Sequence, residues 1–231
     1  MTKLPGLHER AYERRRFLVN HQALVRGQDV LLGPDTQSPL APAHRILPGT
    51  VIVRELQGER FTHPGSPTAS VNRPAAVSSL APADAAWGGT VITASLATGL
   101  GVAVPLPAQV ADNAAAIDAL NQNSVFQVLF LADEDQQGNV RVRTRAAGST
   151  TYLHVRSSID AAFGPQGASG SGADADYRVT DALGELRDLD GRPLEASVAT
   201  LLAGHFFESE LLHLTPEARV VLARRGSVFG G

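Results

Sequence analysis

The chain has 231 residues, of which 43% are hydrophobic, so it is long enough for one large domain or two small ones, each with a core. Its formal net charge of −3 argues against a protein that binds nucleic acid by neutralising phosphates. The absence of cysteine excludes disulfides, thiolate metal sites and a cysteine nucleophile.

The sequence also gives no sign of a membrane or export segment. Its longest apolar tracts, residues 99–106 and 125–132, are much shorter than the roughly 20 residues of a membrane-spanning helix. Residues 1–22 contain neither an apolar run of signal-peptide length nor a small-residue cleavage site. We therefore expect a protein that is made and folds in the cytoplasm and has no membrane partner.

Residues 1–40 are predicted to form an extended N-terminal arm. A charge cluster occupies residues 9–16, and several prolines with Ser, Thr and Gln follow between residues 27 and 48. This composition is typical of irregular chain that lies over a surface. The charge cluster is either a basic arm that docks on a partner or a solvated, loose terminus.

Residues 44–64, HRILPGTVIVRELQGERFTHP, predict a small β unit. The Pro-Gly pair at 48–49 specifies a turn, and the β-branched run at 50–53 predicts a strand. A second short strand is expected around residues 60–62, after the turn at Gln57-Gly58.

This segment resembles the head decoration proteins of tailed bacteriophages, the lambda-like, capsid-cementing kind. The resemblance lies in the order of leucine, Gly-Thr-Val, short strand, glycine, charged-aromatic pair and proline. It implies a monomeric or trimeric cap that clamps neighbouring major-capsid subunits on an icosahedral lattice. Residues 107–231 have no counterpart in that family, and no functional residue is carried over from it.

Residues 41–106 are predicted to form one β-rich domain, a small barrel or β-tulip-like fold. Strand signals recur at 90–93 and 102–104, separated by paired glycines. Trp87, which precedes two glycines, is either a stacking platform or a core or interface anchor. The large apolar area of tryptophan favours an anchor.

Residues 107–231 are predicted to form an α+β region with two hairpins and short helices. Apolar spacing predicts an amphipathic helix over 109–122, and the run 125–131 is assigned to helix in preference to strand. The alternating segments 140–145 and 151–156 predict a hairpin. Ser157-Ser158 predict a helix cap, with the helix ending at Gly164.

Beyond residue 164, flexible and ordered segments are predicted to alternate along the chain. The low-complexity run 164–173 predicts a flexible loop, and Asp190-Gly191 predicts the turn of a second hairpin. Thr215-Pro216-Glu217 predicts the start of a final helix, which Gly226 ends.

No segment has the spacing of a metal site. The acidic turn 133–138 half-matches a calcium loop, but Thr144 stands where the bidentate Glu should be. Residues 205–213 hold two His and two Glu, but the histidines are eight apart, whereas the zincin spacing needs four. We interpret that segment as an exposed polar helix face around apolar residues. No cofactor and no metal are expected.

The sequence lacks a recognisable active site, because it has no G-x-S-x-G, no Gly-Lys pair and no dinucleotide fingerprint. We therefore expect a structural virion protein that cements the major-capsid lattice from outside, as a homotrimer made in the host cytoplasm. Its interface anchors are expected to be Phe17, Leu18 and Trp87. Two alternatives stay open: another phage head, connector or tail protein, and a hydrolase with a dispersed active site.

Overall fold

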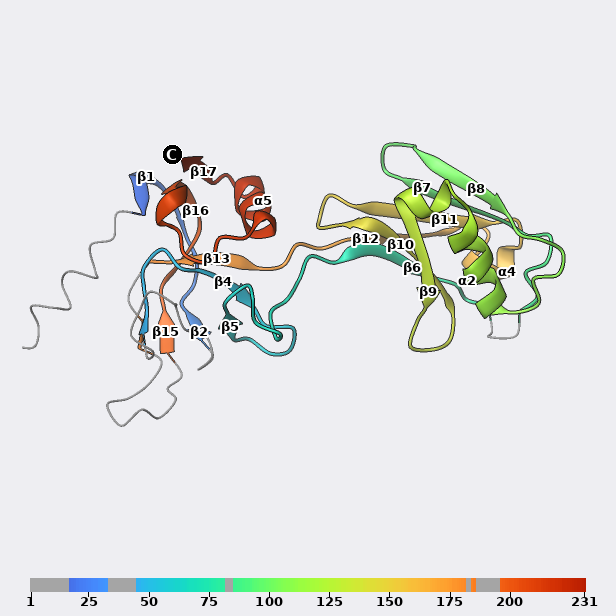
Figure 1. Cartoon of the computed structure of the whole chain (residues 1–231), viewed down its shortest axis with the longest axis horizontal. Helices are drawn as coiled ribbons and strands as arrows, with labels where there is room; N and C mark the ends of the chain where they lie inside the picture. Colours follow the sequence, from blue (N-terminus) through green and yellow to red (C-terminus); the bar gives the residue numbers. More distant parts are fainter. Residues whose placement is uncertain (1–16, 33–44, 82–84, 182–183, 186–195) are drawn as a thin grey trace, which may run out of the picture. The chain divides into compact units, whose positions relative to one another are not determined.

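The computed structural model describes residues 17–32, 45–81, 85–181, 184–185 and 196–231. The chain folds as two compact units (Figure 1), one made of residues 1–71 and 175–231 (unit 1) and the other of residues 72–174 (unit 2). Unit 2 is therefore an insertion in the sequence of unit 1. The fold is α+β and rich in β structure, as predicted.

Unit 1 is built on a sheet that curls into a half-barrel and has eight strands within the described residues. In spatial order these are β1 (Leu18–Arg26), β16 (Thr200–Phe207), β13 (Tyr177–Thr180), β4 (Val51–Arg54), β5 (Phe61–Thr62), β2 (Val30–Leu32) and β15 (Ala196–Val198), with β17 (Val228–Gly230) parallel to β16. A further pair joins β3 (Arg45–Ile46) to β14 (Gly184–Glu185).

The predicted strand pair within 44–64 is confirmed as β4 and β5, which pair antiparallel through Val53 and Thr62. Gly49 takes a φ of +81°, and the Thr50 hydroxyl donates to the Leu47 carbonyl at 2.7 Å, so the turn before β4 is fixed from both sides. Beyond β4 in the sheet lies β13, from the far end of the sequence.

Part of the predicted N-terminal arm is instead sheet. Residues 18–26 form β1 and residues 30–32 form β2, because their apolar side chains are needed in the core: Leu32 is fully buried and Leu18 packs against the buried cluster of unit 1. The charge cluster at 9–16 lies outside the described residues.

The final helix is confirmed as α5 (Pro216–Arg224), which follows the short 3-10 helix η1 (Glu208–Glu210). The Thr215 hydroxyl accepts a hydrogen bond from the Ala218 amide at 3.2 Å, and Gly226 has a φ of +94°. The helix buries Ala218, Val221 and Leu222 in the unit 1 core.

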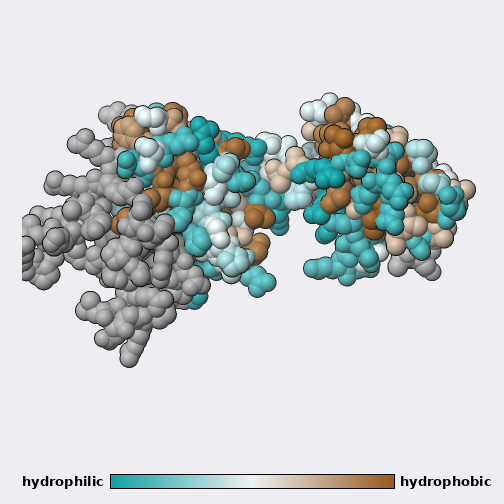
Figure 2. Space-filling model, viewed as in Figure 1, coloured by the Kyte–Doolittle hydropathy of each residue, from teal (hydrophilic) through white to brown (hydrophobic). Residues whose placement is uncertain are grey.

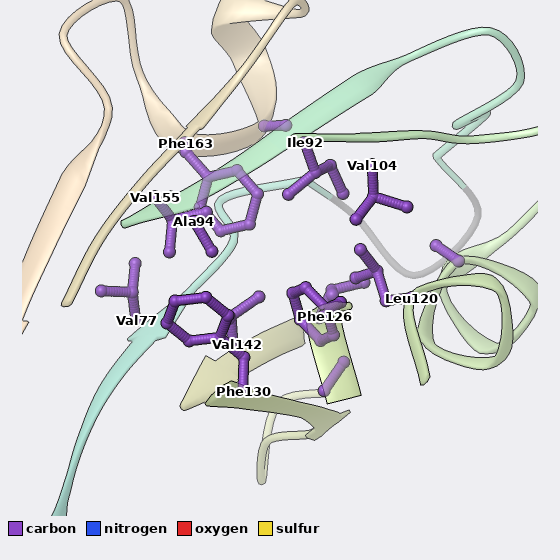
Figure 3. Close-up of a cluster of buried hydrophobic side chains, with 14 of the residues drawn as sticks. Val77, Ile92, Ala94, Val104, Leu120, Phe126, Phe130, Val142, Val155 and Phe163 are labelled. Carbon is purple, nitrogen blue, oxygen red and sulfur yellow. The ribbon is translucent and has the colours of Figure 1, made fainter. Parts of the chain in front are cut away.

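In its described residues, unit 2 has two sheets and three short helices. One sheet has the order β6 (Pro74–Ser78), β10 (Val140–Ala147) and β9 (Phe130–Glu134); the other has β12 (Ala168–Ser171), β11 (Tyr152–Ser157), β7 (Val91–Leu96) and β8 (Gly101–Pro105). The helices are α2 (Asn113–Gln122), α3 (Phe126–Leu129) and α4 (Asp160–Phe163). Figure 3 shows Ile92, Val155 and Phe163 facing Phe126, Phe130 and Val142 in the core.

Several predictions for this part of the chain were wrong in detail. The domains predicted at 41–106 and 107–231 do not match the two units, because β7 and β8 pair with β11 and belong to unit 2 with it. The segments 140–145 and 151–156 are strands as predicted, but they lie in different sheets and form no hairpin with each other.

The predicted elements between these strands were partly right. The helix expected over 109–122 is α2, whereas the run 125–131 is helix only to Leu129 and then becomes β9. The helix expected to end at Gly164 is α4. Residues 168–171 of the predicted flexible loop form β12, since their backbone pairs with β11. The turn predicted at Asp190-Gly191 lies outside the described residues.

Candidate functional site

An open groove of about 340 Å³ lies in unit 2 between the end of β7, α3 and the connection from β10 to β11. Its lining is mostly apolar, and Figure 2 shows hydrophobic side chains reaching the surface of this unit. We call it the apolar groove; it is lined by Leu96, Ala97, Thr98, Val128, Leu129, Thr144, Arg145, Ala146, Thr150, Thr151 and Tyr152.

Local structure explains why apolar side chains are exposed here. Helix α3 is only four residues long and buries Phe126, so Val128 on another of its faces is left 67% exposed. The Tyr152 ring is 38% exposed, and its hydroxyl donates to the Ser169 hydroxyl at 2.8 Å. The groove therefore presents apolar side chains that are held in place by packing and hydrogen bonds, which is typical of a surface that binds another protein.

Two of the three predicted interface anchors lie in the core of the chain itself. Trp87 is 1% exposed and contacts the Phe163 ring, and Phe17 is 4% exposed and stacks on Phe206. Packing within the chain already buries both side chains, so neither is available to a partner. The prediction that they are surface anchors is therefore wrong for both. Leu18 is partly buried against the unit 1 core.

The acidic turn 133–138 is the tip of the β9–β10 hairpin. The Asp135 carboxylate accepts hydrogen bonds from the Gln137 and Asn139 amides, both at 2.9 Å. The bond from Asn139, with a further one from Ser78, lowers the pKa of Asp135 to about 2. Asp133 is paired with Arg141 at 2.7 Å, so these carboxylates stabilise the hairpin itself.

The segment 205–213 is not the polar helix face that we expected. It is the end of β16 followed by η1, because Phe206 is fully buried in the sheet core. His213 has a φ of +60° and its ring stacks on His63 at a centroid distance of 5.5 Å. Among the residues that the structure describes, no group of three or more His, Asp or Glu is placed to hold a metal ion.

Sequence reasoning missed the apolar groove. Its residues come from four segments, 96–98, 128–129, 144–146 and 150–152, that only the fold brings together. The one available signal was the run 125–131, where a short helix with apolar residues on every face must leave some of them exposed.

Comparison with known proteins identifies no family: no family model matches the chain and no curated protein matches it. Among solved structures, the chain is similar to the D2–D3 domains of the flagellar cap protein FliD from Serratia marcescens, at 10% identity and a TM-score of 0.35, over 80% of this chain and 97% of that one. A similarity this low carries no argument about function. In the described part of the chain, no helix has both the length and the apolarity needed to cross a membrane.

Proposed function

We propose that this chain is a structural protein of a tailed-phage virion that binds the outside of the capsid and stabilises the major-capsid lattice. The observation that carries the proposal is the apolar groove of unit 2, which leaves Val128 two-thirds exposed. The resemblance of residues 44–64 to capsid-cementing proteins supplies the partner, the major capsid protein.

The energetics of the groove suit a modest interface that is repeated many times. Burying a valine side chain completely is worth about 1.5–3 kcal/mol, so covering the exposed part of Val128 contributes about 1–2 kcal/mol. Tyr152 adds an aromatic ring with few rotatable bonds, the kind of residue that dominates interface energies. An ordinary interface of about 800 Å² per partner then suffices, because each copy on the lattice needs only moderate affinity.

The test is binding of the purified chain to expanded capsids that lack it, measured by co-sedimentation. Val128→Asp places a charge in the apolar groove and should weaken binding by about tenfold or more, since about 1.4 kcal/mol corresponds to a factor of ten. The matched control is Val220→Asp, which changes a valine that is 46% exposed on α5 of unit 1.

Negative-stain microscopy of the same particles locates the bound chain. Density at threefold or hexamer-centre positions supports the cementing role, whereas density only at a vertex or tail assigns the chain to another part of the virion. If Val128→Asp binds capsids as tightly as the control variant does, the apolar groove is not the surface that contacts the capsid. No association of the unmodified chain with particles would contradict a virion role and restore the hydrolase alternative.

A further inference from the structure

The outward face of the sheet formed by β12, β11, β7 and β8 differs in charge from the chain as a whole. Along β11, Leu153 and Val155 point into the core, whereas Tyr152, His154 and Arg156 occupy the outward positions. None of the four strands contains an Asp or Glu, although the chain carries a net charge of −3. The face therefore has a cation and no acidic residue of its own.

Small hydroxylated side chains flank the central strand. Thr93 is the cross-strand partner of Arg156, and Ser95 is the partner of His154. On the other side, Ser169 is opposite His154, and its Oγ lies 2.9 Å from the imidazole Nδ1. Ser169 also accepts a hydrogen bond from the Tyr152 hydroxyl, so its Oγ connects Tyr152 and His154 on the outward face of β11.

A hollow of about 330 Å³ opens at the Arg156 end of this face. It is lined by Val91, Thr93, Arg156, Ser157, Ser158, Gly164, Pro165 and Gly167. Within the described residues, no carboxylate or carbonyl bonds to the Arg156 guanidinium, whereas Arg141 and Arg178 are paired with aspartates at 2.7 and 2.8 Å. Asp160, the nearest acid in the sequence, makes no ion pair with Arg156.

Gly167 is the residue that permits this arrangement. Its φ is +75°, and a Cβ atom there would lie 2.3 Å from Arg156 Cγ and 3.0 Å from His154 Cε1. Glycine is therefore required both for the backbone conformation and to make room for the two side chains. The same Cβ would lie 2.5 Å from the Val155 carbonyl oxygen, so a larger residue would strain the backbone as well as move Arg156.

We propose that this face binds an acidic saccharide, with a carboxylate at Arg156 and its hydroxyl groups along the strand toward Tyr152. An exposed guanidinium that pairs with no described residue, on a sheet face whose strands contain no Asp or Glu, favours a carboxylate, which it binds through charge-assisted hydrogen bonds. The Thr93 hydroxyl, which lines the hollow, and the imidazole of His154 suit a hydroxylated ligand. Tyr152 and Arg156 are about 13 Å apart along the strand at ~3.3 Å per residue, so the face accommodates more than a single ion.

The test is a titration of the isotopically labelled full chain with oligogalacturonate, followed through the backbone amide signals. The signals of Thr93, Arg156 and Gly167 should shift. Arg156→Gln should weaken binding by about tenfold, because a hydrogen bond to a charged group is worth about 1.5–3 kcal/mol. Arg224→Gln, which changes an exposed arginine on α5 of unit 1, should bind as the unmodified chain does.

Gly167→Ala should weaken binding as well, and its melting temperature shows whether unit 2 stays folded. Three results would overturn the proposal: no shift of these amides, equal affinity for a neutral maltooligosaccharide, or the same shifts and affinity with inorganic phosphate alone. The last result would identify a simple anion site. Equal weakening by Arg224→Gln would show that only general charge matters and would also overturn it.

Discussion

Removal of the Asn113 side chain should destabilise unit 2 strongly. Asn113 is 4% exposed and connects two groups: its Oδ1 accepts a hydrogen bond from the Trp87 indole N–H at 2.7 Å, and its Nδ2 donates to the Gly138 carbonyl at 2.8 Å. Asn113→Ala leaves both groups without this partner. An unsatisfied buried group costs about 1–3 kcal/mol, so we expect the free energy of unfolding to fall by about 2–4 kcal/mol.

The chain provides its own probe for this experiment. Trp87 is its single tryptophan and lies in unit 2, so tryptophan fluorescence during urea unfolding reports on that unit. Gln122→Ala is the matched control, because Gln122 is exposed on the same helix α2 and should change stability by less than about 0.5 kcal/mol. If Asn113→Ala also falls below about 0.5 kcal/mol, the hydrogen-bonded connection is not a stabilising element and the reasoning fails.

Three further substitutions test other local features. Gly49→Ala should destabilise unit 1 by about 1–3 kcal/mol in thermal melts, because φ is +81° and the new Cβ would lie 2.9 Å from Phe17; an unchanged melt would contradict this. Asp112→Ala removes the cap hydrogen bond from the Ala115 amide at 2.8 Å and should cost about 1 kcal/mol in urea unfolding, and no loss would refute the cap. The pKa of Asp135, about 2 in the folded chain, lies below the value of about 3.9 expected in the unfolded chain. The stability that the ionised Asp135 carboxylate gives to the folded state is therefore complete above about pH 3.9 and is lost as the pH falls through about 2. Asp135→Asn cannot ionise and should lose less stability than the unmodified chain between pH 4 and pH 2, whereas parallel urea midpoints would exclude the linkage.

Local signals in the sequence predicted the elements well. Thr215 and Pro216 specify a helix start through one hydroxyl and one fixed φ, and that helix is present. Apolar and polar residues alternate over 140–145, which predicts a strand with one buried face, and β10 has this burial pattern. Such signals depend mainly on neighbouring residues, so they were reliable at these two places.

Pairing and burial could not be predicted in the same way. The alternation of 140–145 and 151–156 does not specify a partner, and β10 and β11 pair with β6, β9, β7 and β12 instead of each other. The sequence around Trp87 is equally compatible with a side chain buried in the core and with one exposed at an interface, so its burial could not be predicted. The apolar groove exists only because distant segments converge, which the sequence does not encode locally.

The cementing role is tested most directly by the temperature at which capsids rupture, measured with and without saturating amounts of the chain. A protein that binds the intact lattice and not the ruptured shell stabilises the lattice by mass action. Occupied capsids should therefore rupture at a higher temperature than bare ones, and Val128→Asp should reduce the difference. If bare and occupied capsids rupture at the same temperature, the chain does not cement the shell.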